Sequence, residues 1–169
     1  MTLDKFDYAI LAVLQEDARA GLNEISARVG LSNTPCWNRI KRMEQDGVIQ
    51  GYTVRIDPAA VGFADTVIVQ ITLESHSEQT LHDFGQALEA IPEVQEAMLI
   101  SGDYDYLLRI AVRDTRDYER LLRERLYRIP GIRHSKSSFV LRKLKDKPVP
   151  LGIEPVKSQA RTARKTARR

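Results

Sequence analysis

The chain has little of what metal and redox enzymes need. It contains a single cysteine, Cys36, so an internal disulfide cannot form. Its three histidines, His76, His82 and His134, do not show the spacing of metal ligands. We therefore expect no metal site, no cofactor and no catalytic residues in this protein.

Long apolar runs are also lacking. No stretch reaches the roughly 18 consecutive apolar residues that a membrane span needs. The opening sequence MTLDKFDYAIL lacks the basic start and the cleavage site of a secretory signal peptide. We expect a cytoplasmic protein without a membrane partner. With 43% apolar residues, the chain can still build real cores in one ordinary domain or two small ones.

Positive charge is scarce except at one end of the chain. Residues 157–169 contain six lysines or arginines and no acid, so subtracting them from the net charge of +3 leaves −3 on residues 1–156. We expect a disordered basic tail over residues 146–169, because the segment is poor in large apolar side chains. Two readings of the tail stay open: a solvated terminus, or a non-specific phosphate-binding arm.

Helical periodicity dominates the N-terminal part of the chain. Asp4 can cap a first helix whose apolar residues recur at steps of three and four. A second helix is expected to begin with Asn23 as its N-cap and to end at Gly30. A third is expected to have Thr34 as N-cap and Pro35 as first helical residue. The sequence thus predicts a compact set of three short helices.

The third of these helices has one apolar and one polar face. At about 100° per residue, Cys36, Ile40 and Met43 lie together and polar side chains gather on the opposite side. A polar helix that follows a glycine-marked turn is typical of a helix-turn-helix reader of the major groove. An ordinary amphipathic helix with a solvated face is the alternative. The candidate DNA-binding residues, chosen for groups that bind bases or phosphates, are Ser32, Asn33, Thr34, Trp37, Asn38, Lys41 and Arg42.

After Gly51 the pattern changes to alternation. The segment YTVRID, residues 52–57, predicts a short strand that would serve as a wing or a link. Further strands are expected at 66–73, 94–100, 106–112 and 132–143, and helices at 78–91 and about 117–128. The order βαββαβ is that of a ferredoxin-like domain, so the fold class is α+β. Helices would cover one face of its sheet, and the other face favours homodimerisation.

A short polar stretch, Gly102, Asp103, Tyr104 and Asp105, separates two of the expected strands. Glycine and aspartate favour a hairpin turn. A catalytic pair of carboxylates would need a nucleophile, a metal ligand or an acid-raising partner, and the sequence shows none beside them. A turn alone does not call for a tyrosine and a second carboxylate, so a ligand cradle is also predicted.

The sequence resembles the family of the leucine-responsive regulatory protein and AsnC, the feast/famine regulators. Four segments carry the resemblance over roughly residues 3–145: LDKFDYAILAVLQEDAR, GLSNTPCWNRIKRMEQDGVIQGYT, LISGDYDYLLRI and IPGIRHSKSSFV. The resemblance implies a winged helix-turn-helix domain over residues 1–50, a strand linker over 51–63 and a ferredoxin-like domain over 64–145. It also implies homodimers that often assemble into octamers on DNA.

The same resemblance implies an effector site built around the Gly102–Asp105 turn, at a contact between dimers. In that site backbone N–H groups near Gly102 would bind the carboxylate of an amino acid, and an acid would bind its ammonium. The candidate effector-binding residues are Met98, Ser101, Gly102, Asp103, Tyr104, Asp105 and Ser137.

The sequence therefore predicts a sequence-specific transcription regulator that binds double-stranded DNA and is modulated by a small effector, an amino acid. It is not expected to be an enzyme. Two alternatives remain at this point: an architectural DNA-organising protein, and a sirohaem-decarboxylase-like enzyme on the same fold. The polar and basic face of the third helix argues against the enzyme.

Overall fold

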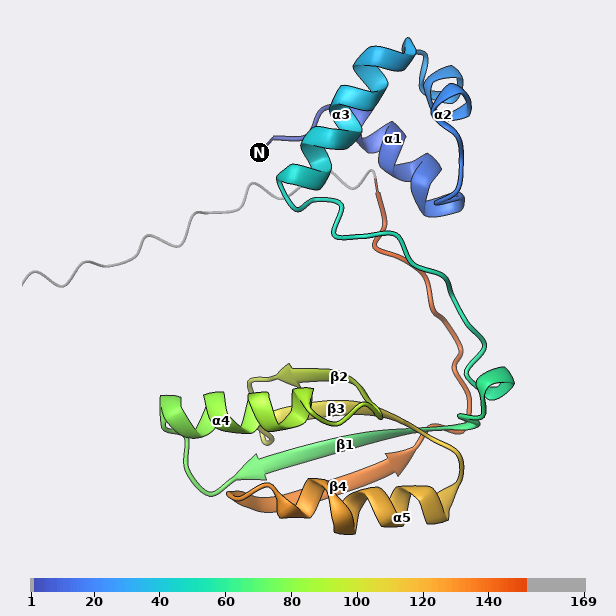
Figure 1. The fold of residues 1–169 in the computed structure, drawn as a ribbon. Coiled ribbons are helices and arrows are strands. Elements are labelled where there is room, and N and C mark those ends of the chain that lie inside the picture. Colours follow the sequence, from blue (N-terminus) through green and yellow to red (C-terminus); the bar gives the residue numbers. More distant parts are fainter. Residues whose placement is uncertain (1, 152–169) are drawn as a thin grey trace, which may run out of the picture. The chain divides into compact units, whose positions relative to one another are not determined.

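The computed structural model describes residues 2–151 and divides them into two compact units (Figure 1). The first unit consists of residues 2–54 and 145–151, and the second of residues 55–144. Most of the expected basic tail, residues 152–169, lies outside the described part. Within residues 2–151, the structure contains no helix with the length and apolar character of a membrane span.

Three helices form the first unit: α1 (Lys5–Glu16), α2 (Leu22–Val29) and α3 (Asn33–Gln45). The predicted start of α1 is confirmed, because the Asp4 carboxylate accepts the N–H groups of Phe6 and Asp7. The Asp7 carboxylate in turn accepts the N–H of Asp4, which completes a capping box. The predicted end of α2 at Gly30 is also confirmed, with φ at 71° in the left-handed region.

The predicted N-cap of α2 is wrong. The helix begins two residues earlier, with Gly21 as its N-cap. The Asn23 side chain is committed elsewhere: its Oδ1 accepts a hydrogen bond of 2.5 Å from Nδ2 of Asn33. A tertiary contact between the two helices therefore uses the group that the sequence suggested for capping.

The predicted start of α3 is wrong as well. The N-cap is Ser32 rather than Thr34, and the Cys36 N–H closes the first turn onto the Ser32 carbonyl at 3.2 Å. Pro35 thus lies in the third helical position instead of the first. The helix tolerates it there because the N–H groups of the whole first turn have no partner within the helix.

The interior of this unit is a small apolar core between the three helices. Its fully or nearly fully buried members are Ile10, Val13, Ile25, Cys36 and Met43. Cys36 is among them, as its place on the apolar face predicted. The core fixes α3 against α1 and α2 and leaves the polar face of α3 outside.

The strand expected over residues 52–57 does not form. Tyr52, Val54 and Ile56 are exposed, and the only sheet in residues 2–151 does not include them. A strand exists only where its backbone pairs with a neighbour. An alternating pattern alone does not supply that neighbour within one chain.

The second unit has the predicted βαββαβ order. Its elements are β1 (Asp65–Leu73), α4 (Glu78–Glu89), β2 (Val94–Leu99), β3 (Tyr106–Val112), α5 (Thr115–Glu124) and β4 (Ile132–Phe139). The strands lie in the order β2-β3-β1-β4 with antiparallel pairing throughout. Both helices cover the same face of this sheet (Figure 1). The α+β fold class with a ferredoxin-like domain is therefore confirmed.

Some boundaries in this unit differ from the prediction. The Asp114 carboxylate caps α5 by accepting the Asp117 N–H, so the helix begins earlier than expected. It ends at Glu124, and a 3-10 turn, η2 (Leu126–Arg128), follows. The last strand ends at Phe139, where the ladder with β1 stops.

Alternation along β1 decides which face of the sheet becomes the core. Val67, Val69, Ile71 and Leu73 are buried under the helices. Phe84 of α4 is also buried there, and its ring lies 5.0 Å from that of Tyr106. The opposite face carries Thr66, Ile68, Gln70 and Thr72 of the same strand, and none of these four is fully buried.

Candidate DNA-binding and effector sites

The helix α3 presents its polar face to the outside, as a recognition helix would. Ser32, Thr34 and Asn38 are exposed. Asn33 is exposed too, but its carboxamide ties α3 to α2: Oδ1 accepts the Ser26 hydroxyl at 2.6 Å. Asn33 therefore connects two helices, a role that the sequence did not predict.

Trp37 stands half-exposed at the edge of this face. It lines a hollow of about 300 Å³ together with Leu14, Ile40 and Tyr52. The indole therefore covers apolar side chains on one side and meets solvent on the other.

The candidate cation Lys41 is held by a carboxylate in the free protein. Lys41 Nζ lies 2.8 Å from Glu44 Oε2, one helical turn along α3. The hydroxyl of Tyr52 donates to the other Glu44 oxygen at 3.0 Å. The Lys41 ammonium and, after it, the Tyr52 hydroxyl lower the pKa of the Glu44 carboxyl, while burial raises the pKa of the Tyr52 phenol. The ion pair between Lys41 and Glu44 can be predicted from the sequence, because residues three apart on a helix are neighbours on its surface.

The candidate cation Arg42 is held by a residue far away in sequence. Its Nη2 lies 2.8 Å from Oδ2 of Asp7, whose side chain is fully buried. Arg39 binds the other Asp7 oxygen at 2.8 Å and also reaches Asp4. Sequence reasoning missed Asp7 and Arg39, because nothing in the pattern says that α1 and α3 meet there.

In the second unit, the Gly102–Asp105 stretch forms the turn between β2 and β3. Gly102 has φ at 139°, which favours glycine. The Ile100 N–H donates to the Asp105 carbonyl, and the Asp105 N–H donates to the Ile71 carbonyl, each at 2.8 Å. The hairpin reading of this stretch is confirmed, and the turn is anchored on the central strand β1.

The Asp105 carboxylate has hydrogen-bond partners outside the turn on both of its oxygens. Its Oδ2 accepts the Leu73 N–H at 2.8 Å, and its Oδ1 lies 2.9 Å from Nε2 of His76. The carboxylate is mostly buried, with 18% of the Asp105 side chain exposed, whereas the imidazole is 62% exposed. Sequence reasoning missed His76, which lies in the loop between β1 and α4.

The other effector candidates are divided between two places. Ser101 and Asp103 are exposed in the turn, and Tyr104 is partly buried. Met98 lies nearby on the edge strand β2, opposite Leu107 of β3. These residues form one group around the turn.

Ser137 does not join that group within one chain. It belongs to β4, at the opposite edge of the sheet from β2. Its partner on β1 is the buried Val69, and its hydroxyl lies 2.5 Å from that of Tyr118 on α5. Ser137 thus faces the helices, and two strands, β3 and β1, separate it from Met98.

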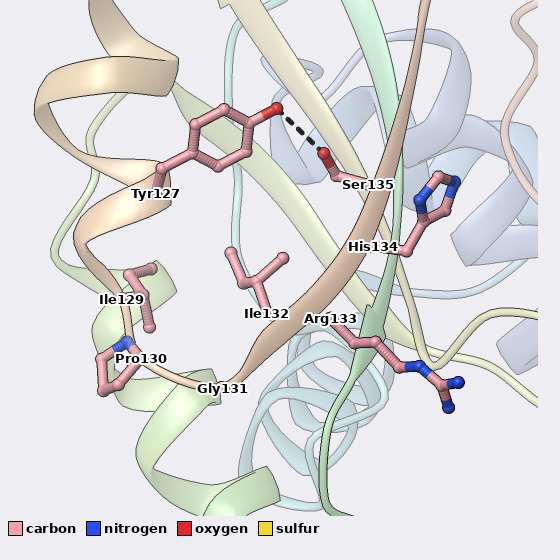
Figure 2. A pocket seen from close by; sticks show the side chains of 8 residues that line it. All are labelled: Tyr127, Ile129, Pro130, Gly131, Ile132, Arg133, His134 and Ser135. Carbon is pink, nitrogen blue, oxygen red and sulfur yellow. Dashed lines mark hydrogen bonds between the residues drawn. The ribbon is translucent and has the colours of Figure 1, made fainter.

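A separate hollow of about 480 Å³ lies between η2 and the start of β4. Figure 2 shows Tyr127 pointing across it to Ser135, with 3.0 Å between the two hydroxyl oxygens. Pro130 and Gly131, in the loop between η2 and β4, also line it. No candidate effector residue lines this hollow.

Both units of the chain match families of known proteins. Residues 66–150 match the model of the Lrp/AsnC ligand-binding domain, and residues 3–50 match a winged helix-turn-helix DNA-binding model. The chain belongs to the Lrp/AsnC family. It is a DNA-binding transcription regulator of that family. The leucine-responsive regulatory proteins of Klebsiella pneumoniae and Escherichia coli K12 are each 41% identical to it over 143 residues, covering 85% of this chain and 87% of theirs.

Solved structures of Lrp/AsnC regulators have the same fold. One is a regulator from Neisseria meningitidis in complex with L-methionine, with a TM-score of 0.83, 32% identity and coverage of 89% of this chain and 98% of the other. Another is an AsnC-family regulator from Agrobacterium tumefaciens, with a TM-score of 0.82, 39% identity and coverage of 88% and 97%. A feast or famine regulatory protein from M. tuberculosis, complexed with L-methionine, has a TM-score of 0.81, 31% identity and coverage of 89% and 99%.

Proposed function

We propose that this Lrp/AsnC regulator binds double-stranded DNA through α3 and senses an amino acid at the Gly102–Asp105 turn. The observation that carries the effector site is the Asp105 carboxylate, fixed by the Leu73 N–H and approachable beside His76. A carboxylate fixed in this way can bind an ammonium group, and such charge-assisted hydrogen bonds are stronger than those between neutral groups. The methionine complexes of two relatives support an amino acid as the ligand class.

Around Asp105 the proposed effector site uses residues of the turn and of β2. Backbone N–H groups near Gly102 would hold the ligand carboxylate, and Tyr104 and Met98 would contact its side chain. Ser101 and Asp103 complete the group. Ser137 would take part only if a second copy of the chain supplied it, because its own chain places it at the opposite edge of the sheet.

The DNA contact would use the outward face of α3. Asn38 can bind adenine, and Lys41 and Arg42 can bind guanine or phosphate. Ser32, Asn33 and Thr34 lie at the helix start, where phosphate is favoured, and Trp37 would flank the DNA backbone. Before DNA binds, Glu44 holds Lys41 and Asp7 holds Arg42. On binding, each cation must therefore leave its carboxylate or share itself between the carboxylate and the DNA.

A homodimer would supply two recognition helices. The open face of the sheet supports it, with Ile68, Leu107 and Met98 contributing apolar surface among polar side chains. Two half-sites about one helical turn apart, roughly 34 Å, are then expected. Light scattering after size exclusion gives the mass of the assembly and distinguishes a monomer from a dimer and from an octamer.

Effector binding is tested by a thermal-shift screen of the purified protein against the twenty amino acids, with L-methionine as the first probe. A ligand at about 100 times its dissociation constant stabilises the folded state by roughly 2.7 kcal/mol, which raises the melting temperature by several degrees. Glycerol at equal concentration is the control. If all twenty leave the melting temperature unchanged, the effector proposal is wrong.

DNA binding is tested by selecting preferred duplexes from a random library and measuring affinity by gel shift. The double variant Lys41→Ala/Arg42→Ala should lose most of the preference for the selected duplex over a random duplex of equal length. An unchanged preference would contradict the assignment of these two side chains.

A further inference from the structure

We propose that Asp7 is a positioning residue for DNA readout: its carboxylate holds the Arg42 guanidinium in one orientation on α3 before DNA binds. This inference rests on the proposed contact between Arg42 and DNA. Asp7 itself would not touch the DNA, because its side chain is fully buried in the first unit. It would act only through Arg42.

The contacts of Asp7 leave its carboxylate no freedom to turn. Oδ2 accepts the Asp4 N–H at 3.0 Å and Arg42 Nη2 at 2.8 Å. Oδ1 accepts Arg39 Nη1 at 2.8 Å. A buried charge persists in a protein only when partners of this kind satisfy it, so the carboxylate is a fixed point to which α3 is attached.

Arg39 and Arg42 share Asp7 but have different surroundings. Arg39 is the more enclosed, with 24% of its side chain exposed, and its guanidinium also binds Asp4 and lies 5.4 Å from the Phe6 ring. Arg42 keeps 47% of its side chain exposed. Arg39 therefore anchors the helix, whereas Arg42 is the cation that can bind Asp7 and a further partner together.

An arginine is suited to this double use. Its guanidinium has five N–H donors in a rigid plane, and Asp7 takes Nη2. A fork whose orientation is set in advance loses less conformational freedom when it binds a base edge or a phosphate. Lys41 provides the contrast within the same helix: its ammonium is a point charge on a flexible stem, paired with the partly exposed Glu44.

The experiment is a double-mutant cycle on DNA preference, defined as the affinity for the selected duplex divided by that for a random duplex. Asp7→Asn and Arg42→Ala should each lower the preference about tenfold, the size expected for one base contact. In the double variant Asp7→Asn/Arg42→Ala, the loss should equal that of Arg42→Ala alone. Glu16→Gln, which breaks the exposed pair with Arg28 in the same unit, should change nothing.

Two results would overturn the positioning role while leaving the Arg42 contact intact: an Asp7→Asn variant with wild-type preference, or losses that add in the double variant, as expected for a purely structural role. An Arg42→Ala variant with wild-type preference would instead remove the proposed DNA contact itself, and the inference with it. The two failures are thus distinguishable.

A second measurement does not depend on how well Asp7→Asn folds. In the wild-type protein, nitrogen-15 NMR of arginine side chains should show slow rotation of the Arg42 guanidinium in the absence of DNA. Arg116, on the exposed surface of α5, serves as the reference for fast rotation. Equal rotation rates for Arg42 and Arg116 would overturn the proposal.

Discussion

The Asp105 carboxylate accepts the backbone N–H of Leu73 over 2.8 Å. This bond joins the β2–β3 turn to the end of the central strand β1, and the neighbouring oxygen of the same carboxylate reaches His76 at the start of the next loop. A group bound at Asp105 would therefore act on the turn, on β1 and on the loop before α4 together.

Replacing Asp105 with alanine should abolish the thermal shift caused by L-methionine, because the ammonium loses its carboxylate. DNA affinity in the absence of an amino acid should stay near the wild-type value, since Asp105 lies in the other unit from α3. Asp83→Ala removes an exposed carboxylate of α4 that binds Gln79 and serves as the matched control. An Asp105→Ala protein with the wild-type methionine titration would contradict the assignment.

The variant Glu44→Gln should bind DNA more tightly than the wild type. Loss of the Glu44 charge releases the Lys41 ammonium and removes a negative group beside the proposed interface. If Lys41 then neutralises one more phosphate, the slope of log affinity against log salt becomes more negative by about 0.9. Glu119→Gln, which breaks the Arg123 pair of α5, is the control. Weaker or unchanged binding at low salt would count against Lys41 as a DNA contact.

Stability of the N-terminal unit should fall in acid. The side-chain hydrogen bond from Arg39, followed by the backbone N–H of Asp7, lowers the pKa of the Asp4 carboxyl below its ordinary value of 3.8. A lowered pKa in the folded state contributes stability above pH 3.8, and this contribution is lost as the pH falls through the folded-state pKa. The urea midpoint, read from the fluorescence of Trp37, should therefore decrease from pH 5 towards pH 3.

The matched variant for this acid effect is Asp4→Asn. Asparagine keeps the capping hydrogen bonds of α1 but carries no charge. Its urea midpoint should vary less between pH 5 and pH 3 than that of the wild type. Identical pH profiles for the two proteins would show that the Asp4–Arg39 pair does not contribute in this way.

Truncation of Phe84 to alanine should cost about 3–5 kcal/mol of unfolding free energy, the range for removing a large buried aromatic side chain. Phe84 is fully enclosed between α4 and the sheet and lies against Tyr106. Urea denaturation followed by circular dichroism measures the loss. Tyr127→Phe, which removes the half-exposed partner of Ser135, should cost less than about 1.5 kcal/mol. If the two variants lose a similar amount of unfolding free energy, Phe84 does not belong to the core.

Several features of this protein could be predicted from the sequence because local physics decides them. The Asp4 cap, the Gly30 stop and the hairpin at Gly102 depend on groups within a few residues of each other. The βαββαβ order follows from periodicities of about two and 3.6 residues. Where a side chain had a distant partner instead, as Asn23 has in Asn33, the local prediction failed.

The sequence by itself determined the two-part architecture, the buried face of each element and the polar face of α3, because burial of apolar side chains is encoded in spacing along the chain. Only the tertiary structure decided that Asp7 holds Arg42, that Asp105 meets Leu73 and His76, and that Ser137 faces Tyr118 at the far edge of the sheet. Each of these contacts joins residues between 19 and 35 positions apart. Their partners are chosen by how helices and strands pack, which no local pattern records.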